Sequence, residues 1–348
     1  MNDNKIELSI IVPAYNIPEV FLSRCVSSLH AQKGNNLEFI LLNDGSSFDW
    51  VDGILREAAD IDDRMVYVNK PNTGVSDTRN EGMRMARGEY LMFVDADDEL
   101  MPDACQKSLE CIKESNADVI VLGYCFSHKE IRHNPISVII SEEEKERLLC
   151  DIVSWDTKEY TSLGLNVDAP WGKIFKKNIA EKNNIIYPVG LARSQDAIFC
   201  LYFYEYSRKI VFDNHICIYS YNDNMDSVCR SCSETSVRML PFILGELEKF
   251  VEKHRPINKF RRAIGFRVYR GLLEAELRYF FHPKCDVPVP ELKLCYKDLL
   301  NNKFVNKYLS QIRYRDIKSY KMRVCLFLQK HKLVEFLFRI KKYAYPKK

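Results

Sequence analysis

The first 125 residues alternate between short apolar runs and segments in which apolar residues recur every three or four positions. The apolar runs Leu8–Val12 and Leu37–Leu42 predict strands, and the apolar spacing across Leu22–Leu29 predicts a helix with one buried face. The same alternation predicts, in order, a helix near Val51–Ala59, a strand at Met65–Val68, a helix from an N-cap at Ser76 to about Ala86, a strand at Tyr90–Val94, a helix at Asp103–Glu114 and a strand at Val119–Tyr124. Strands that alternate with helices are joined by right-handed crossovers, so we expect an α/β fold with a mostly parallel, Rossmann-like sheet flanked by helices.

The rest of the chain has a different pattern. Beyond Ser236 it reads as helical, so we expect a domain over residues 1–235, with halves 1–125 and 126–235, and a helical C-terminal extension over 236–348. Further predicted elements are a helix near Glu142–Ile152, a helix near Asp196–Tyr206, a strand over Ile210–Tyr221 and a proline-rich break between helices at His282–Pro290.

The composition excludes several classes of protein. Of the 348 residues, 46% are hydrophobic and 28% are charged, which is the balance of a globular protein and not of a disordered or fibrous one. No charge-free apolar stretch approaches the roughly 20 residues of a membrane-spanning helix, and Met1–Lys5 lacks the features of a secretory signal. The twelve cysteines follow no regular spacing, so we expect reduced thiols and a cytoplasmic location.

Basic residues are concentrated at the end of the chain. From Arg313 to Lys348 there are twelve Lys or Arg and two acids, a net charge of +10, whereas the whole chain carries +3 and the remainder therefore −7. Apolar residues between Val324 and Ile340 are interspersed with these charges as in an amphipathic helix. Two interpretations are open: a helix lying on an anionic membrane surface, peripheral at its inner face, or a helix packed on the catalytic domain with a solvated basic face. Nucleic acid is disfavoured as the partner, because no recognised motif accompanies the charge.

An acidic tetrad, Asp95-Ala96-Asp97-Asp98, directly follows the apolar run that ends at Val94. Three carboxylates in four residues repel one another unless a cation lies between them. Because Mg²⁺ and Mn²⁺ prefer carboxylate and phosphate oxygens, the tetrad is a candidate site for a divalent ion that bridges to a phosphate. The alternative is structural, with Asp97 or Asp98 capping the next helix.

Two other polar clusters follow strands or begin helices in the same half. Asp44, at the end of a predicted strand, is placed either to accept a hydrogen bond from a base N–H or only to form the turn with Gly45. Arg79, in the first turn of a predicted helix, is placed either to bind a phosphate with two N–H groups or to be solvated. In open α/β sheets ligands bind at the carboxyl ends of the strands, so we expect these clusters to share one edge of the sheet.

The order of these motifs resembles the family 2 glycosyltransferases of GT-A fold. The motifs that carry the resemblance are Leu8-Ser9-Ile10-Ile11-Val12-Pro13-Ala14-Tyr15-Asn16, Leu42-Asn43-Asp44-Gly45-Ser46-Ser47, Asn72-Thr73-Gly74-Val75-Ser76-Asp77-Thr78-Arg79-Asn80-Glu81-Gly82 and Gly88-Glu89-Tyr90-Leu91-Met92-Phe93-Val94-Asp95-Ala96-Asp97-Asp98. The match is specific over residues 6–125, weaker to about 225, and does not extend beyond 240.

The resemblance implies an inverting hexosyltransferase that takes a sugar from a nucleotide diphosphate donor, usually UDP, with Mn²⁺ or Mg²⁺. Residues 1–125 would then bind the nucleotide-sugar and residues 126–235 the acceptor, a glycan or lipid-linked glycan in the synthesis of a bacterial-type surface polysaccharide. The residue roles implied are these: Pro13 and Tyr15 line the nucleotide pocket, Asp44 reads the uracil, Asn72 and Arg79 contact the nucleotide and its phosphates, Asp95 binds ribose or sugar hydroxyls, and Asp97 coordinates the metal.

The resemblance also implies a position for the catalytic base. The family commonly supplies it from a Glu-Asp pair just before a helix, downstream of a Trp-x-Lys segment. Trp171-Gly172-Lys173 matches that segment, and Gln195-Asp196 stands where the pair is expected, with glutamine in place of glutamate. Asp196 is therefore the candidate base that deprotonates the acceptor hydroxyl, with a helix N-cap as its structural alternative.

Two competing functions remain open from the sequence. Gln195 favours a catalytically inactive nucleotide-sugar sensor or subunit on the same fold. A different nucleotide enzyme, such as a dehydrogenase or nucleotidyltransferase, is disfavoured because no G-x-G-x-x-G follows Leu8–Val12 and no G-x-x-x-x-G-K-[ST] occurs in the chain.

Overall fold

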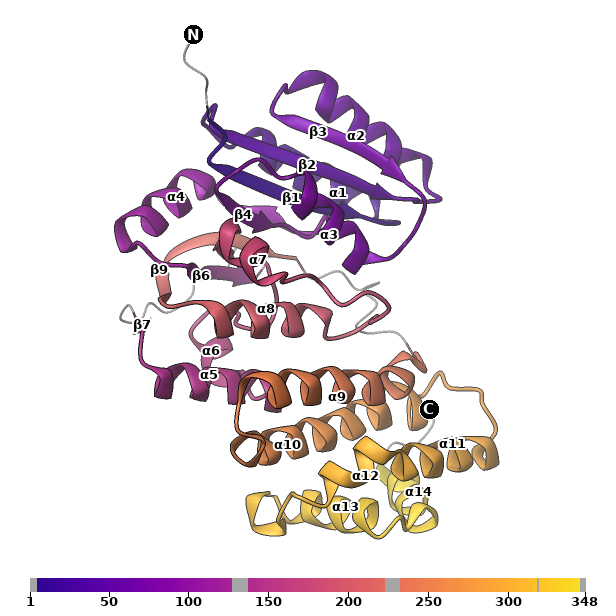
Figure 1. Cartoon of the computed structure of the whole chain (residues 1–348). Helices are drawn as coiled ribbons and strands as arrows, with labels where there is room; N and C mark the ends of the chain where they lie inside the picture. Colours follow the sequence, from indigo (N-terminus) through magenta and orange to yellow (C-terminus); the bar gives the residue numbers. More distant parts are fainter. Residues whose placement is uncertain (1–4, 127–136, 223–231, 318, 345–348) are drawn as a thin grey trace. The chain divides into compact units, whose positions relative to one another are not determined.

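The computed structural model describes residues 5–126, 137–222, 232–317 and 319–344 of the chain (Figure 1). The chain divides into two compact units. The first contains Met1–Leu149, Thr157–Gly190 and Gln195–Asn224, and the second contains Cys150–Asp156, Leu191–Ser194 and Met225–Lys348. Two short segments within the predicted acceptor half, residues 126–235, therefore belong to the helical unit, which the sequence pattern did not predict.

The first unit is built on a nine-stranded, mostly parallel sheet, and the predicted fold class is confirmed. Eight strands follow the order β3-β2-β1-β4-β8-β6-β9-β5, and β7 pairs with β9. Neighbouring strands are parallel from β3 to β4 and between β6 and β9, whereas β8 is antiparallel to both β4 and β6. The strands are β1 Leu8–Ala14, β2 Leu37–Asp44, β3 Met65–Lys70, β4 Tyr90–Phe93, β5 Glu99–Leu100, β6 Val119–Phe126, β7 Ser137–Ile139, β8 Lys173–Lys176 and β9 Ile210–Tyr221.

Helices cover both faces of this sheet, which is why β1 and β2 are almost entirely buried and rich in apolar residues. Ile10 and Val12 face the core that contains the buried side of α1, whereas Ile11 faces α3. Gly82 permits this approach, since a Cβ atom there would lie 2.5 Å from the Ile11 side chain. The helices of the unit are α1 Glu19–His30, α2 Asp49–Ile61, α3 Val75–Met85, α4 Ala104–Ser115, α5 Glu142–Ser154 (its end belongs to the second unit), α6 Lys158–Ser162, α7 Lys177–Asn183 and α8 Gln195–Tyr206.

The second unit is helical, as predicted beyond Ser236 (Figure 1). Its elements are α9 Thr235–His254, α10 Ile257–Ala275, the π-helical segment η2 Glu276–Phe280, α11 Val289–Asn301, α12 Lys303–Leu309, the 3-10 turn η3 Tyr314–Asp316, α13 Tyr320–Lys330 and α14 Val334–Ala344. The predicted break at 282–290 ends earlier than expected, because Pro290 lies in the first turn of α11, where its missing N–H leaves no intrahelical bond unmade.

The amphipathic segment near the end of the chain forms two helices, and its apolar side chains pack within the helical unit. Leu326, Leu337 and Phe338 are buried, and the Phe338 ring contacts Phe280 edge to face. Most of the apolar stripe is therefore buried by packing, as in the second interpretation. The contact of Phe338, however, is with the helical unit and not with the catalytic domain. Residues 318 and 345–348 of the predicted basic tail lie outside the described residues. Within the described ranges, the helices are too short or too polar to span a bilayer.

Candidate active site

The loops after β1 and β2 are tied together at the carboxyl edge of the sheet. The Asn16 backbone N–H donates to Ser46 Oγ at 3.0 Å, and the Ser47 N–H donates to Asn16 Oδ1 at 2.8 Å. Pro13, at the end of β1, is half-buried, and Tyr15 has half of its surface exposed. The two residues predicted to line a nucleotide pocket therefore lie on a rim that the hydrogen bonds of Asn16 hold to the β2 loop.

Asp44 is a buried carboxylate at the end of β2 that organises the loop before α3. Its oxygens accept hydrogen bonds from Lys70 Nζ at 2.7 Å, from the Thr73 N–H at 2.9 Å and from the Gly74 N–H at 2.9 Å. Burial alone would raise the pKa of Asp44, but the hydrogen bonds from Lys70 and Thr73 outweigh it and lower the pKa. Asp44 is thus ionised and more than a turn residue.

Gly45 lets the β2 loop approach the segment that leads into α3. Its φ is +67°, and a Cβ atom there would lie 2.6 Å from the Asn72 backbone nitrogen. Asn72 itself is exposed. The predicted base-reading residue Asp44 and the predicted nucleotide contact Asn72 therefore belong to one compact rim.

The acidic tetrad after β4 is held by β9 and does not cap a helix. Asp98 is buried and accepts from the Tyr219 hydroxyl at 2.7 Å and from the Asn222 N–H at 2.8 Å. Burial, followed by the nearby charges of Asp95 and Asp97, raises the pKa of Asp98 to about 8. The next helix begins at Ala104 with Asp103 at its N-cap, so the structural alternative for Asp97 and Asp98 is wrong.

Arg79 lies at the centre of the site. Its Nη2 donates to Asp95 Oδ1 at 2.7 Å, and its Nη1 donates to Asp196 Oδ1 at 2.5 Å. Burial would lower the pKa of Arg79, but the attraction of Asp196 and Asp95 raises it, so the guanidinium stays charged. Arg79 is buried, and the solvated alternative is therefore wrong. Its described hydrogen bonds are to carboxylates, and contact with a phosphate stays a prediction.

Asp196, in the first turn of α8, keeps 28% of its side-chain surface exposed. Burial raises its pKa to about 6, against the attraction of Arg79, which lowers it. The other charges that act on it are Asp95 and Asp168, which raise the pKa, and Lys173, which lowers it. A partly exposed carboxylate with a pKa near neutrality has the proton affinity that a general base needs.

Gln195 is uncharged, although it stands where the family commonly has a glutamate. Gln195 is buried, and its Oε1 has no hydrogen-bond partner among the described residues. The preceding residue, Ser194, has a φ of +61°, so the chain enters α8 in a left-handed conformation. Asp196 is therefore the carboxylate that the predicted Glu-Asp position supplies to this site.

The Trp171-Gly172-Lys173 segment packs against the residue that binds the acidic tetrad. The Trp171 ring stacks on Tyr219, the residue that donates to Asp98, with ring centres 4.9 Å apart. Lys173 is fully buried, and its ammonium donates to the backbone carbonyls of Asn166 and Ala169. Burial lowers the pKa of Lys173. This segment thus fixes the turn at 166–171.

A divalent metal fits the donor set only with oxygens from a ligand. Within the described ranges, no cluster of three His, Cys, Asp or Glu side chains is arranged to hold an ion. Asp97 is half-buried next to Asp95, and a single protein carboxylate completed by diphosphate oxygens is an ordinary Mg²⁺ or Mn²⁺ environment. The residues therefore fit a metal that arrives with a phosphorylated ligand.

Sequence reasoning missed several residues that shape the site. Lys70 is the last residue of β3 and pairs with Asp44, and its position at the carboxyl end of a parallel strand was an available signal. Tyr187, Tyr219 and Asn222 gave no signal, since each lies far along the chain from the residue that it contacts.

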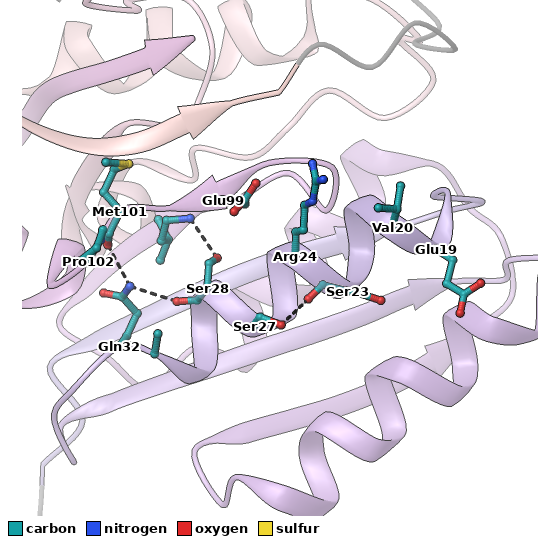
Figure 2. Close-up of a pocket in the computed structure, with 12 residues that line it drawn as sticks. Glu19, Val20, Ser23, Arg24, Ser27, Ser28, Gln32, Glu99, Met101 and Pro102 are labelled. Carbon is teal, nitrogen blue, oxygen red and sulfur yellow. Dashed lines mark hydrogen bonds between the residues drawn. The ribbon is translucent and has the colours of Figure 1, made fainter. Parts of the chain in front are cut away.

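A cavity of about 880 Å³ lies apart from these residues. Figure 2 shows it along α1, where Ser23, Arg24 and Ser27 face Glu99 and Met101. None of the predicted site residues lines it. Several of its polar groups bond within the protein, including Ser28 Oγ, which accepts from the Leu100 N–H, and Gln32, which donates to the Met101 carbonyl. The cavity is therefore not the predicted donor site.

Comparison with known proteins finds sequence similarity to glycosyltransferases. Residues 9–156 match the family model described as Glycosyl transferase family 2. The chain is 29% identical over 277 residues to the Glycosyltransferase GlyA of Streptococcus pneumoniae serotype 4, which covers 78% of this chain and 38% of that protein. It is 27% identical over 207 residues to the Poly(ribitol-phosphate) beta-glucosyltransferase of Bacillus spizizenii, which covers 59% of this chain and 30% of that protein. This chain therefore spans well under two thirds of the length of either relative.

Solved structures show the same fold. The S. aureus TarS 1-349 structure in complex with UDP-GlcNAc has a TM-score of 0.67 and 17% identity, with 97% of this chain and 91% of that chain covered. The mannosyltransferase PcManGT from Pyrobaculum calidifontis, in complex with GDP-Man and Mn²⁺, has a TM-score of 0.50 and 14% identity, with 94% and 86% covered. The likeness to TarS extends over the sheet and the C-terminal helices.

Proposed function

We propose that the chain, which matches the Glycosyl transferase family 2 model over residues 9–156 and is similar to bacterial glycosyltransferases, is an inverting hexosyltransferase that uses a UDP-sugar. The acceptor is a hydroxyl of a glycan or lipid-linked glycan in the synthesis of a bacterial surface polysaccharide. The observation that carries the proposal is the Arg79 bridge, in which one guanidinium holds Asp95 and the candidate base Asp196. The relatives support the class of reaction, and the TarS complex with UDP-GlcNAc supports UDP as the nucleotide.

The donor binds at the carboxyl edge of the sheet in this proposal. Pro13 and Tyr15 line the nucleotide pocket, with the exposed Tyr15 ring available to the base. Asp44 reads the uracil with the acceptor capacity that its three hydrogen bonds leave, and Asn72 contacts the nucleotide. Asp95, whose side chain is 29% exposed beside Arg79, binds ribose or sugar hydroxyls.

Asp97 is the proposed protein ligand of Mn²⁺ or Mg²⁺. When bound, the metal supplies positive charge that stabilises the diphosphate leaving group. The PcManGT complex with Mn²⁺ supports a metal on this fold. Asp97 is assigned to the ion because the family resemblance places the metal ligand at this position of the tetrad.

Asp196 takes the proton of the acceptor hydroxyl. As that proton moves to the carboxylate, the hydroxyl oxygen forms a bond to the anomeric carbon of the sugar. The bond between that carbon and the phosphate oxygen breaks, and UDP leaves with the bonding electrons. Attack from the face opposite the leaving group inverts the configuration, which requires a base on the acceptor side and no covalent intermediate. Arg79 keeps Asp196 oriented while it is ionised.

The first test is nucleotide binding by the full chain. The thermal midpoint is measured with UDP, GDP, dTDP and NAD, each with and without Mn²⁺, because a ligand at about 100 times its dissociation constant adds roughly 2.7 kcal/mol of stability. We expect a shift with UDP that grows with Mn²⁺, and then turnover of a UDP-sugar that Asp196→Asn abolishes. A shift with NAD in place of UDP contradicts the proposal.

A second candidate function rests on Gln195. A buried amide with an unpaired oxygen stands where the family commonly has a glutamate, which favours an inactive nucleotide-sugar sensor or subunit. The two functions differ in one result: the sensor binds UDP and turns over none of the UDP-sugars offered, alone or with acceptor. Turnover by the purified chain that depends on Asp196 eliminates it.

We also propose that residues 313–348 contact an anionic membrane at its inner, cytoplasmic face. Arg313, Arg315 and Lys321 are exposed, and Tyr320 and Phe327 expose 78% and 44% of their surface. Basic and aromatic side chains together suit the headgroup region of an anionic bilayer. All cysteines in the described ranges are free thiols, which supports a reducing compartment.

A further inference from the structure

Tyr187 connects the two helices that carry the candidate catalytic pair. Its side chain is fully buried, and its ring stacks face to face on Phe199 of α8, with ring centres 4.1 Å apart and planes 3° from parallel. The Arg79 guanidinium carbon lies over the same ring, 5.3 Å from its centre. Phe199 is three residues after Asp196, so both project from one side of α8. Tyr187 therefore touches Arg79 directly and Asp196 through the helix that bears it.

Asn80 holds the backbone of Tyr187 in place. Its Nδ2 donates to the Tyr187 carbonyl at 2.9 Å, and its Oδ1 accepts from the Tyr187 N–H at 2.8 Å. The amide thus pairs with both backbone groups of Tyr187, as a neighbouring strand would. Asn80 directly follows Arg79 on α3, and both are buried. One turn of α3 therefore supplies both the guanidinium and the anchor of the ring that lies against it.

We propose that Tyr187 and Asn80 are positioning residues that hold Arg79 in the orientation from which it reaches both Asp95 and Asp196. The inference rests on the proposed role of Asp196 as the base. Arg79 Nε is buried and has no hydrogen-bond partner among the described residues, so the two carboxylates and the Tyr187 ring are what fix the side chain. Without the ring, the guanidinium is free to turn away from one carboxylate.

In this proposal the face of the Tyr187 ring positions Arg79, and the Tyr187 hydroxyl does not. Tyr187 Oη is buried and has no hydrogen-bond partner among the described residues. Tyr187→Phe therefore removes an unpaired polar atom and keeps both ring contacts. Tyr204 provides a matched control, because it is also a fully buried tyrosine with an unpartnered hydroxyl, and it lies on α8 further from Asp196.

The test measures the titration of Asp196 directly, so that it does not depend on turnover. The full chain is labelled with ¹³C at the aspartate carboxyls, and Asp196→Asn identifies the resonance. The groups that act on Asp196 are Arg79, Asp95, Asp168 and Lys173. Because the attraction of Arg79 lowers the pKa of Asp196, we expect Tyr187→Leu to raise it, whereas Tyr187→Phe and Tyr204→Leu leave it unchanged.

Kinetics provide the second readout. We expect Tyr187→Leu to lower kcat about tenfold or more at neutral pH, because displacing the base by about 1 Å reduces the rate by factors of this size. Tyr204→Leu should lower the thermal midpoint comparably and keep kcat. If Tyr187→Leu does not fold, Asn80→Ser tests the same claim with the ring retained. An unchanged Asp196 titration in a folded Tyr187→Leu or Asn80→Ser protein overturns the inference. If the wild-type chain shows no turnover, the proposed function is contradicted, but the titration of Asp196 can still be interpreted.

Discussion

Arg79 Nη1 and Asp196 Oδ1 are 2.5 Å apart, although 117 residues separate them in the chain. The pair joins α3, in the half of the domain predicted to bind the nucleotide-sugar, to α8, in the half predicted to bind the acceptor. The same guanidinium binds Asp95. In the proposed mechanism, this one buried cation therefore couples donor recognition to base chemistry.

Removal of that cation should destabilise the protein. Arg79→Gln leaves Asp95 and Asp196 without their buried partner, and we expect a loss of about 3 kcal/mol in the free energy of unfolding at pH 7. The loss should shrink at pH 5, where protonation of Asp196 relieves the repulsion between the carboxylates. Urea denaturation at both pH values measures this. Arg56→Gln, which breaks the exposed pair with Asp52, is the control and should cost less than about 0.5 kcal/mol.

Asp196→Asn should abolish transfer and stabilise the fold. The pKa of Asp196 is about 6 in the folded protein and about 3.9 in an unfolded chain, so the folded state holds the proton more tightly. Stability contributed by this group is therefore lost as the pH rises from about 4 to 6. We expect the variant to be about 2 kcal/mol more stable than wild type at pH 7.5, with little difference at pH 4. Thermal unfolding across this range measures it, and equal stability at pH 7.5 contradicts the assigned titration.

The fall in kcat at low pH, the acid limb of the pH profile, should follow the titration of Asp196. We expect activity to fall as the pH drops below about 6, because the protonated carboxyl cannot accept the acceptor proton. Gln195→Glu adds a buried negative charge next to Asp196 and should move this limb to higher pH. Gln195→Met, which removes the unpaired amide oxygen, should keep the limb in place and change stability by less than about 1 kcal/mol. An acid limb that Gln195→Glu leaves unmoved argues against Asp196 as its source.

The effect of Mn²⁺ on stability and on sugar transfer should depend on Asp97. We expect Asp97→Asn to bind UDP without the additional thermal shift that Mn²⁺ gives the wild type, and to lose transfer. Titration with Mn²⁺ at fixed UDP concentration, followed by the thermal midpoint, measures this. Asp60→Asn, an exposed aspartate on α2, is the control and should respond to Mn²⁺ like the wild type. Near-normal turnover of Asp97→Asn with metal present shows that the ligand assignment is wrong.

Membrane binding should depend on the basic, aromatic surface of residues 313–339. We expect the full chain to sediment with vesicles that contain phosphatidylglycerol and not with pure phosphatidylcholine vesicles, and to be released by salt. Arg315→Glu with Lys321→Glu should weaken binding more than tenfold, since each basic residue contributes about 1 kcal/mol. Lys253→Glu with Lys284→Glu reverses two exposed charges elsewhere in the same unit and should have a smaller effect. Binding to a soluble polyanion but not to these vesicles rejects the membrane as the partner.

Local patterns predicted some details wrongly. Ser76 was expected to cap α3, but the helix begins at Val75 after Gly74, and Ser76 Oγ is buried without a described partner. A serine near a helix start is a cap only if its own backbone lies outside the helix. Here the helix begins two residues earlier than an N-cap at Ser76 implies, directly after the Thr73 and Gly74 N–H groups that donate to Asp44. Asp98 was wrongly predicted to cap a helix because its partners, Tyr219 on β9 and Asn222 just after it, lie more than 120 residues away.

The sequence by itself determined the α/β class, the mostly parallel sheet and the edge at which Asp44, Asp95 and Asp97 lie. Strands buried on both faces must be apolar, and parallel strands end at a common edge, so composition along the chain is enough to locate these features. Only the tertiary structure decided that Arg79 binds Asp196, that Tyr187 lies against Arg79 and that the apolar stripe of the basic segment is buried. Those contacts join residues that are distant in sequence, and no local periodicity encodes which distant partner a buried charge or ring will meet.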